Sequence, residues 1–372
     1  MYQLFNRAYQ GKTVLVTGHT GFKGSWLAIW LRELGANVIG FSLPTLPTNP
    51  SNFEVTGLAK KISDIRGDLR EPEAITATIK QYQPEIVFHL GAQPIVLQSV
   101  ADPVGTFTSN VNGTINVLEA VRQNNCVRAV VAVTTDKVYE NQDWLWGYRE
   151  NDRLGGKDPY SASKAMAELA IAAYRSTYFS AERYDTHGVA VASTRAGNVI
   201  GGGDFGAYRL VPDTMRALLA GDVVGLRMPG SVRPWQHVLE PLSGYLWLGA
   251  MLLENGPAFA EAWNFGPMEH KGVTAQAITE KIIEQWGSGS WTFTGENSQN
   301  IETGQLRLSW DKAAACLGWR PVYSWVDAVT EIVTWFKSYE QGLDMYQVCR
   351  EHIETYVERA MGLGLPWICE ND

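Results

Sequence analysis

The sequence predicts an α/β protein built on a doubly wound parallel sheet, with a smaller C-terminal lobe. Short β-rich runs alternate with longer helical stretches through the first half of the chain. Strands that alternate with helices favour a parallel sheet covered on both faces. The 372 residues suffice for one large domain or two ordinary ones, and 45% of them are apolar, which allows a sizeable core.

Six strands are predicted in the order of the chain. The run KTVLVT is typical of a buried strand, and apolar residues recur at helical spacing directly after it. The predicted strands are Lys12–Thr17, Asn37–Phe41, Lys61–Arg66, Glu85–Leu90, Ala129–Thr134 and Val189–Thr194. The predicted helices include Phe22–Leu34, Val104–Val121 and Tyr160–Tyr178. Crossovers between the parallel strands should be right-handed.

Composition excludes several classes of function. The net charge of −8 argues against nucleic acid as a main partner, because phosphate binding needs a basic face. The four cysteines and six histidines show no metal-binding spacing, so we expect reduced thiols and no metal. The chain has neither a signal-peptide core nor an apolar run of membrane-spanning length. We therefore expect a soluble, cytoplasmic protein without a membrane partner.

A glycine-rich loop follows the first predicted strand. In TGHTGFKG, Gly18, Gly21 and Gly24 stand three residues apart, immediately before the first predicted helix. Glycine permits a tight turn and close backbone approach, and a helix N-terminus offers unpaired N–H groups to a pyrophosphate. A plain tight turn would use the same glycines. The position between first strand and first helix predicts a Rossmann-type dinucleotide site.

The choice between NAD and NADP depends on the end of the second strand. An acid often binds the adenosine ribose there, but no acid occurs before Glu54. No arginine stands there to meet a 2′-phosphate either, which favours NAD. Asp68, in GDLR, could accept from the adenine amine or could cap a helix.

A tyrosine and a lysine share one predicted helical face. In DPYSASK, Asp158 suits a helix N-cap and Pro159 the first helical position, so Tyr160 and Lys164 stand one turn apart. A phenol beside an ammonium at the positive end of a helix can lose its proton more easily. An ordinary amphipathic helix with an exposed lysine is the alternative.

The run AVTTDKVYEN ends a predicted strand with polar side chains. Thr135, Asp136 and Lys137 could form a proton-transfer group or a surface salt bridge. Adjacent residues on an extended strand point to opposite faces. The two charged side chains would therefore converge only where the strand has ended and the chain turns.

Longer stretches carry a family resemblance. TGHTGFKGSWL, TTDKVYEN, WGYREN, DPYSASK, RAGNVIGGGD, RPWQHVLEPLSGY and WNFGP resemble the CDP-glucose 4,6-dehydratases, within the extended short-chain dehydrogenase/reductase superfamily. The resemblance runs from about residue 10 to about residue 340. It implies NAD as cofactor and CDP-glucose as substrate. The implied reaction oxidises C4, removes water across C5 and C6, and returns the hydride to C6, as in deoxysugar and lipopolysaccharide biosynthesis.

The resemblance also implies residue roles. Tyr160 would remove the O4 proton, Lys164 would anchor the nicotinamide ribose and lower the tyrosine pKa, and Thr135 would bind O4. Asp136 would protonate the departing C6 hydroxyl. The dTDP-glucose 4,6-dehydratases carry a second carboxylate where this chain has Lys137, which could be the C5 base or could stabilise the C5 enolate. The expected cofactor-binding residues are Gly18, Thr20, Gly21, Phe22, Lys23, Gly24, Asp68, Leu69, Leu90, Ala92, Thr134, Tyr160 and Lys164.

A second ligand should lie against the C-terminal half. The segment VIGGGDFGAYRLVP predicts a loop near a ligand, and a sugar nucleotide needs arginine for its diphosphate. The expected substrate-binding residues are Gln93, Asn198, Arg209, Arg233 and His237. Asn198 could instead cap a loop, and His237 could instead be a packed core histidine. We expect a NAD-binding domain over residues 1–200, with about 234–262 returning to it, and a lobe that binds substrate over most of 201–372.

Other functions and assemblies stay open at this stage. A sugar-nucleotide 4-epimerase would share Tyr160 and Lys164 but has no need of an acid at position 136. A non-catalytic NAD-sensing protein would keep the glycine loop and usually lose the tyrosine–lysine pair. The resemblance implies a homodimer, in which the apolar faces of Val104–Val121 and Tyr160–Tyr178 pack against their copies, although core packing would explain the same apolar pattern.

Overall fold

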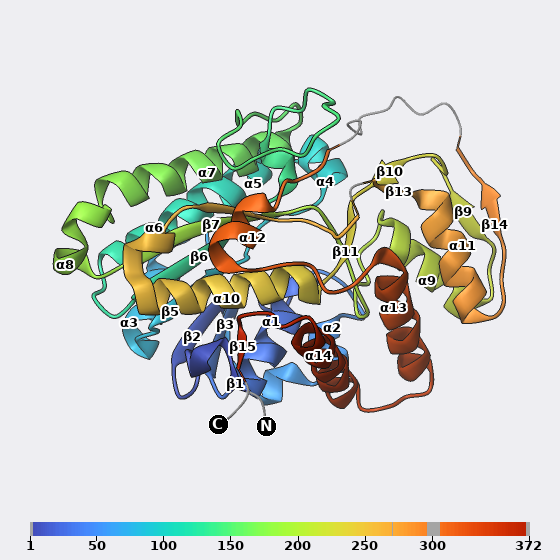
Figure 1. Ribbon diagram of the computed structural model, residues 1–372, viewed down its shortest axis with the longest axis horizontal. Helices are drawn as coiled ribbons and strands as arrows, with labels where there is room; N and C mark the ends of the chain where they lie inside the picture. Colours follow the sequence, from blue (N-terminus) through green and yellow to red (C-terminus); the bar gives the residue numbers. More distant parts are fainter. Residues whose placement is uncertain (1–2, 270, 296–305, 370–372) are drawn as a thin grey trace.

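A seven-stranded parallel sheet forms the centre of the molecule (Figure 1). The computed structural model describes residues 3–269, 271–295 and 306–369. In spatial order the strands are β12 (Ala262–Phe265), β7 (Ala190–Ala196), β6 (Ala129–Val133), β5 (Ile86–His89), β2 (Thr13–Thr17), β3 (Asn37–Ser42) and β4 (Ser63–Arg66). The order reverses between β2 and β5, so ligands are expected at the carboxyl ends of these strands. This sheet confirms the predicted fold class.

Helices cover both faces of the sheet (Figure 1). One face packs against α3 (Pro72–Tyr82), α6 (Gly113–Arg122) and α7 (Pro159–Thr177). The other packs against α1 (Phe22–Glu33) and α10 (Leu239–Asn255), with α14 (Met345–Gly362) outside α1. Alternate residues of each strand serve the two faces, as Val14 and Leu15 do, because successive side chains point opposite ways.

The predicted helix over Val104–Val121 is interrupted. It consists of α5 (Pro103–Phe107), a π-helical turn (Thr108–Asn112) and α6. The extra residue of the π turn accompanies a buried asparagine, Asn110, which accepts from the Gln93 amide at 2.8 Å and donates to Ser163 Oγ at 2.9 Å. Local periodicity does not predict such an insertion, because its partners are distant in the sequence.

A group of small elements lies beyond the carboxyl end of the sheet (Figure 1). The helices α9 (Leu210–Ala220), α11 (Ala275–Trp286) and α13 (Trp325–Glu340) pack together there. Short strand pairs accompany them: β9 (Val224–Leu226) with β14 (Trp291–Phe293), β10 (Val232–Arg233) with β13 (Val273–Thr274), and β8 (Asn198–Ile200) with β11 (Trp235–His237).

The two ends of the described chain meet. Strand β1 (Gln3–Leu4) pairs antiparallel with β15 (Ile368–Cys369), so the segment after the last helix is tied to the segment that precedes the central sheet. Shorter helices complete the connections: α2 (Asn52–Val55), α4 (Val96–Ala101), α8 (Tyr184–His187) and α12 (Asp311–Leu317). Within the described ranges, no helix has both the length and the apolar character that crossing a membrane requires.

Candidate active site

The loop between β2 and α1 brings backbone close to backbone. A Cβ atom on Gly18 would lie 2.8 Å from the Gly91 nitrogen, and one on Gly24 would lie 2.1 Å from the Gly18 carbonyl oxygen. Gly18 has a φ of +75°, which favours glycine. Helix α1 begins at Phe22 with Gly21 as its N-cap and no side chain bonded there. The loop therefore has the close approach and free helix N-terminus that suit a dinucleotide pyrophosphate.

The end of β3, where dinucleotide-binding proteins often carry an acid, has a contact between a histidine and a serine. His19 Nδ1 lies 2.9 Å from Ser42 Oγ, and its Nε2 lies 2.8 Å from Asp64 Oδ1 on β4. Burial lowers the pKa of His19, although Asp64 opposes the shift. The carboxylate near the end of β3 is therefore that of Asp64, which belongs to the neighbouring strand β4.

Asp68 is held by its neighbour Arg70. Its Oδ1 accepts from the Arg70 amide at 2.9 Å and its Oδ2 from Arg70 Nε at 2.8 Å, which lowers the pKa of Asp68. The N-cap of α3 is Glu71, so Asp68 does not cap that helix. The side chain of Leu69 lies against Gly91, which stands between Leu90 and Ala92 in the sequence.

The chain turns directly after β6 and gathers the expected catalytic residues. The strand ends at Val133, and Asp136–Val138 form a single 3₁₀ turn with Thr135 as its N-cap. Thr135 Oγ1 donates to Asp136 Oδ1 at 2.9 Å. Asp136 and Lys137 therefore lie in a turn after the extended strand has ended, so their side chains are not forced to opposite faces. We call residues 135–138 the catalytic turn.

Helix α7 presents its tyrosine and lysine to this turn. Asp158 caps the helix by accepting from the Ser161 amide, and Pro159 occupies the first turn. Tyr160 and Lys164 are both buried. Lys164 Nζ donates to the Val133 carbonyl oxygen at 3.2 Å, and burial lowers the pKa of Lys164 to about 8.

Burial governs the proton affinities of the site. It raises the pKa of Asp136, against the opposing attraction of Lys137 and the hydrogen bond from Thr135. It also raises the pKa of Tyr160 to about 12, opposed by Thr135 and Arg209. The Lys164 ammonium is not among the main influences on Tyr160, unlike the expectation from the sequence. The charge of Asp136 itself raises the Tyr160 pKa, which shows that the two groups are close.

Lys23 joins the same cluster from α1. Burial, together with the charges of Lys164 and Arg209, lowers the pKa of Lys23 to about 8, against the opposing charge of Asp136. Five of the residues predicted for the site therefore interact across four segments: α1, the catalytic turn, α7 and the N-cap of α9. They are Lys23, Asp136, Tyr160, Lys164 and Arg209.

The two predicted arginines lie in different parts of the site. Arg209 Nη1 forms an ion pair with Asp204 at 3.0 Å, and the charge of Arg209 opposes the rise in the pKa of Tyr160. Arg233 instead lines a cavity of about 440 Å³ next to β10. The residues of that cavity are Leu145, Val232, Arg233, Pro234, Lys271, Gly272, Leu306 and Arg307. Its three basic side chains make it suited to a diphosphate.

Gly197 separates this cavity from the catalytic turn. A Cβ there would lie 3.1 Å from Asp136 Oδ2 and 3.2 Å from Pro234 Cγ. The next residue, Asn198, begins β8 and pairs in register with Trp235. Asn198 is half-buried, and its side chain makes no hydrogen bond within the described residues. It is therefore open to a ligand at this junction.

The side chains of three residues predicted to bind ligands make contacts with other protein groups. The Gln93 amide bonds to Ile95 and to Thr106 Oγ1, the latter at 2.8 Å. Thr134 Oγ1 donates to Glu168 at 2.5 Å and faces the helix rather than the loop of glycines. His237 is buried against the rings of Trp26 and Tyr323, which matches the packed-histidine alternative.

The sequence reasoning missed several residues of the site. Lys271 and Arg307 reach it from segments outside the quoted motifs, and Asp204, at the end of RAGNVIGGGD, was not singled out within that motif. Glu168 and Arg195 form a buried ion pair behind the catalytic turn, at 2.9 Å. A signal existed for Glu168, because it follows Lys164 by four residues and so shares its helical face.

Known proteins share this sequence and architecture. The profile of the NAD dependent epimerase/dehydratase family matches residues 14–259. A CDP-glucose 4,6-dehydratase from Salmonella typhimurium is 46% identical over 350 residues, which is 94% of this chain and 97% of the relative. A dTDP-glucose 4,6-dehydratase from an Actinoplanes species is 27% identical over 340 residues, covering 87% of this chain and 98% of the relative.

A solved structure has the same fold and a related sequence. The dTDP-glucose 4,6-dehydratase of Streptomyces venezuelae, solved with NAD and TYD bound, superposes with a TM-score of 0.74. It is 26% identical, and the match covers 90% of this chain and 99% of that one. The chain described here belongs to the NAD dependent epimerase/dehydratase family.

Proposed function

We propose that this chain converts CDP-D-glucose to CDP-4-dehydro-6-deoxy-D-glucose and water. The relative named CDP-glucose 4,6-dehydratase supports the substrate, because its 46% identity extends over 94% of this chain. The observation that carries the chemistry is a buried carboxyl group, Asp136, beside a buried phenol, Tyr160. An epimerase needs the phenol alone, whereas the removal of water needs an acid as well.

The cofactor is NAD, held at the glycine loop and at the Tyr160–Lys164 end of α7. When bound there, NAD⁺ would supply the acceptor for the C4 hydride and, in its reduced form, the donor of that hydride to C6. Gly18 and Gly24 admit the pyrophosphate, since a side chain at either position would collide with backbone. Lys164, fixed by the Val133 carbonyl, is available to the nicotinamide ribose.

The protein side chains move the protons. Tyr160 accepts the proton of the O4 hydroxyl as the C4–H bond breaks, and Thr135 hydrogen-bonds the same oxygen. The 4-ketone makes the C5 proton acidic, and a base beside C5 takes this proton to give an enolate and returns it to C5 when the hydride is delivered to C6. Asp136 then donates a proton to the C6 hydroxyl, which leaves as water. Burial keeps Asp136 protonated to a higher pH than an exposed aspartate, which suits a general acid.

Lys137 acts on the C5 side of this elimination. We expect Lys137→Ala to lower the rate of water loss about 10²-fold, because the variant loses the C5 base or the cation that stabilises the enolate. Lys137→Glu should keep measurable activity, since a carboxylate can take the C5 proton directly. The check is the rate of 4-keto product together with deuterium uptake at C5 in heavy water. A Lys137→Ala enzyme with unchanged rate would show that residue 137 is only structural.

The basic cavity holds the diphosphate of the substrate. Arg233, Lys271 and Arg307 supply three cations, and Arg307 Nη2 also donates to the Leu145 carbonyl oxygen. The cavity adjoins the catalytic turn through Gly197, so a diphosphate there would leave the sugar near Asp136 and Tyr160. The identity of the base follows from the CDP-glucose relative.

Product analysis with a panel of substrates tests the proposed function. The protein is incubated with CDP-, dTDP-, GDP- and UDP-glucose in turn. We expect CDP-glucose to give a 4-keto product that absorbs in alkali and has lost one water. A product that retains its water would indicate a 4-epimerase instead. Tight nucleotide binding with no turnover of any of the four would indicate a non-catalytic binding protein.

The same chain should form a homodimer through α4, α5 and α7. These helices pack together and expose large apolar side chains, of which Val104 is 72% and Leu169 60% exposed. An apolar surface shared by neighbouring helices is typical of a self-complementary interface. Sedimentation velocity should give about twice the 41.2 kDa chain mass, and Leu169→Glu should shift the protein to monomer. A monomeric parent protein would contradict the proposal.

A cytoplasmic location is part of the same proposal. Cys126, Cys316, Cys349 and Cys369 are all free thiols. Free thiols are typical of proteins kept in a reducing compartment.

A further inference from the structure

The catalytic turn is poorly held by its own backbone. The amide of Val138 lies 3.5 Å from the Thr135 carbonyl oxygen, and that of Tyr139 lies 3.4 Å from the Asp136 carbonyl oxygen. Both distances exceed the usual range of about 2.7–3.2 Å for such bonds. A segment that must place an acid and an amine on one side of a sugar therefore needs anchors outside itself.

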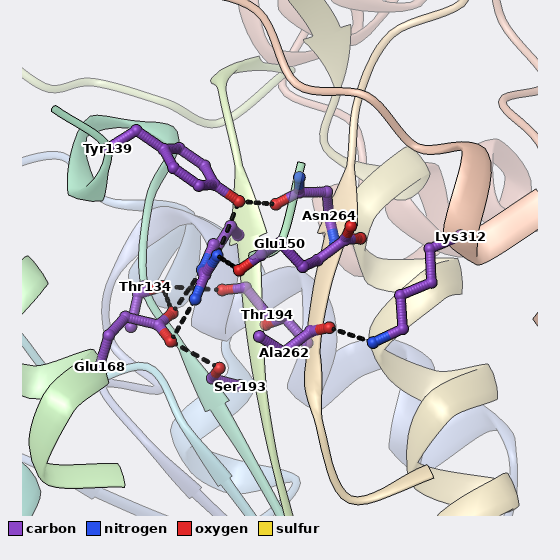
Figure 2. Close-up of polar contacts among 10 residues, drawn as sticks. Thr134, Tyr139, Glu150, Glu168, Ser193, Thr194, Ala262, Asn264 and Lys312 are labelled. Carbon is purple, nitrogen blue, oxygen red and sulfur yellow. Dashed lines mark hydrogen bonds and ion pairs between the residues drawn. The ribbon is translucent and has the colours of Figure 1, made fainter. Parts of the chain in front are cut away.

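One buried ion pair contacts both ends of this turn (Figure 2). Arg195 donates to Glu168 through Nε at 3.0 Å and through Nη2 at 2.9 Å. The same carboxylate accepts from Thr134, the residue before the turn, at 2.5 Å. The remaining guanidinium nitrogen, Nη1, donates to the hydroxyl of Tyr139, the residue after the turn, at 2.7 Å.

The pair is also tied to the rigid sheet. Ser193 on β7 donates to Glu168 Oε2 at 2.7 Å, and Arg195 belongs to the same strand. Tyr139 in turn donates to Asn264 on β12 at 2.8 Å (Figure 2). Every polar atom of the ion pair thus has a partner, which is what a buried pair requires.

We propose that the Glu168–Arg195 pair is a positioning element for the catalytic turn. Its carboxylate fixes the residue before the turn, and its guanidinium fixes the residue after it. Through these two hydrogen bonds, the ion pair keeps the catalytic turn in place, so that Asp136 and Lys137 face the sugar ring of the substrate. Neither Glu168 nor Arg195 touches the reacting atoms, so both act through the turn.

Three single variants separate positioning from general stability. Thr134→Val and Tyr139→Phe each remove one of the two hydrogen bonds to the turn without leaving a buried charge unpaired. Ser193→Ala is the matched control, because it removes a bond to the same carboxylate from a strand that is not part of the turn. Charge-removing variants of Glu168 and Arg195 are avoided, since an unpaired buried charge could prevent folding.

Amide hydrogen exchange on the ligand-free protein is the first measurement. We expect the amides of residues 135–140 to exchange about fivefold faster in Thr134→Val and in Tyr139→Phe, as the loss of one hydrogen bond implies. Ser193→Ala should leave these amides as protected as in the parent protein. Equal exchange in all four proteins, or faster exchange at the turn in Ser193→Ala, would overturn the proposal.

The kinetic measurement rests on the function proposed above. With CDP-glucose, kcat should fall about tenfold in Thr134→Val and Tyr139→Phe, with KM within about twofold of the parent value. Ser193→Ala should change neither constant by more than about twofold. A uniform fall in all three variants, or a change in KM alone, would refute positioning. Failure of the parent protein to turn over CDP-glucose would refute the proposed function, while the exchange result would still decide the role of the pair.

Discussion

Replacing Asp136 with asparagine should stop the loss of water while C4 oxidation continues. The asparagine keeps the size of the side chain and its hydrogen bond with Thr135, but it has no acidic proton for the C6 hydroxyl. The C4 oxidation depends on Tyr160 and Thr135, which are unchanged. We therefore expect the overall rate to fall by about 10²–10⁴, the usual contribution of a general acid.

Single-turnover experiments separate the two steps. Absorbance at the reduced-cofactor band should rise in Asp136→Asn with substrate and then persist, because the sugar cannot lose water and take the hydride back. In the parent protein the same signal should be transient. Unimpaired formation of 6-deoxy product by the variant would refute the role of Asp136 as the acid.

The pH dependence of stability provides an independent check. Burial raises the pKa of Asp136 in the folded chain, so the protonated form is favoured by folding. The stability that comes from this group is complete below its unfolded pKa of about 4 and is lost as pH rises through the raised folded value. Asp136→Asn should therefore unfold at the same temperature as the parent at low pH and at an equal or higher temperature at pH 8. A lower Tm at pH 8 would indicate that folding, not chemistry, explains the lost rate.

The strands and the glycine loop could be predicted because their signals are local. All six predicted strands exist, with ends displaced by at most two residues. The seventh, Ala262–Phe265, was missed because a four-residue run rich in aromatics beside Gly and Pro has no period of its own. Its place in the sheet is decided by pairing with β7, a contact across some seventy positions of chain that no local pattern records.

The residues of the site likewise fall into those that local motifs predict and those that only distant contacts bring in. Thr135, Asp136, Tyr160 and Lys164 lie in two short motifs, so their meeting follows once the sheet order is known. Arg307 joins the Leu145 carbonyl oxygen across 162 positions, so nothing in the nearby residues predicts the contact. For Thr134 the resemblance implies a cofactor contact, which stays a prediction, and the structure adds that its hydroxyl donates a hydrogen bond to Glu168.

Replacing Tyr160 with phenylalanine should nearly abolish C4 oxidation and leave nucleotide binding intact. The phenyl ring fills the same buried space, so α7 and the catalytic turn should keep their packing. What is lost is the oxygen that accepts the O4 proton, which is worth about 10²–10⁴ in rate. The Kd for CDP, measured by calorimetry, should stay within about twofold of the parent value, because the base and diphosphate do not contact residue 160 in the proposed arrangement.

The pH profile distinguishes a lost base from a disturbed site. Burial raises the pKa of Tyr160 to about 12, so in the ligand-free chain the phenolate grows more abundant as pH rises toward that value. The rate of C4 oxidation in the parent protein should increase with pH over the range in which the fold is stable. Tyr160→Phe should lose this dependence along with the rate. A variant that is slow but still accelerates with pH would place the base elsewhere, with Lys164, whose pKa burial lowers to about 8, as the group to test next.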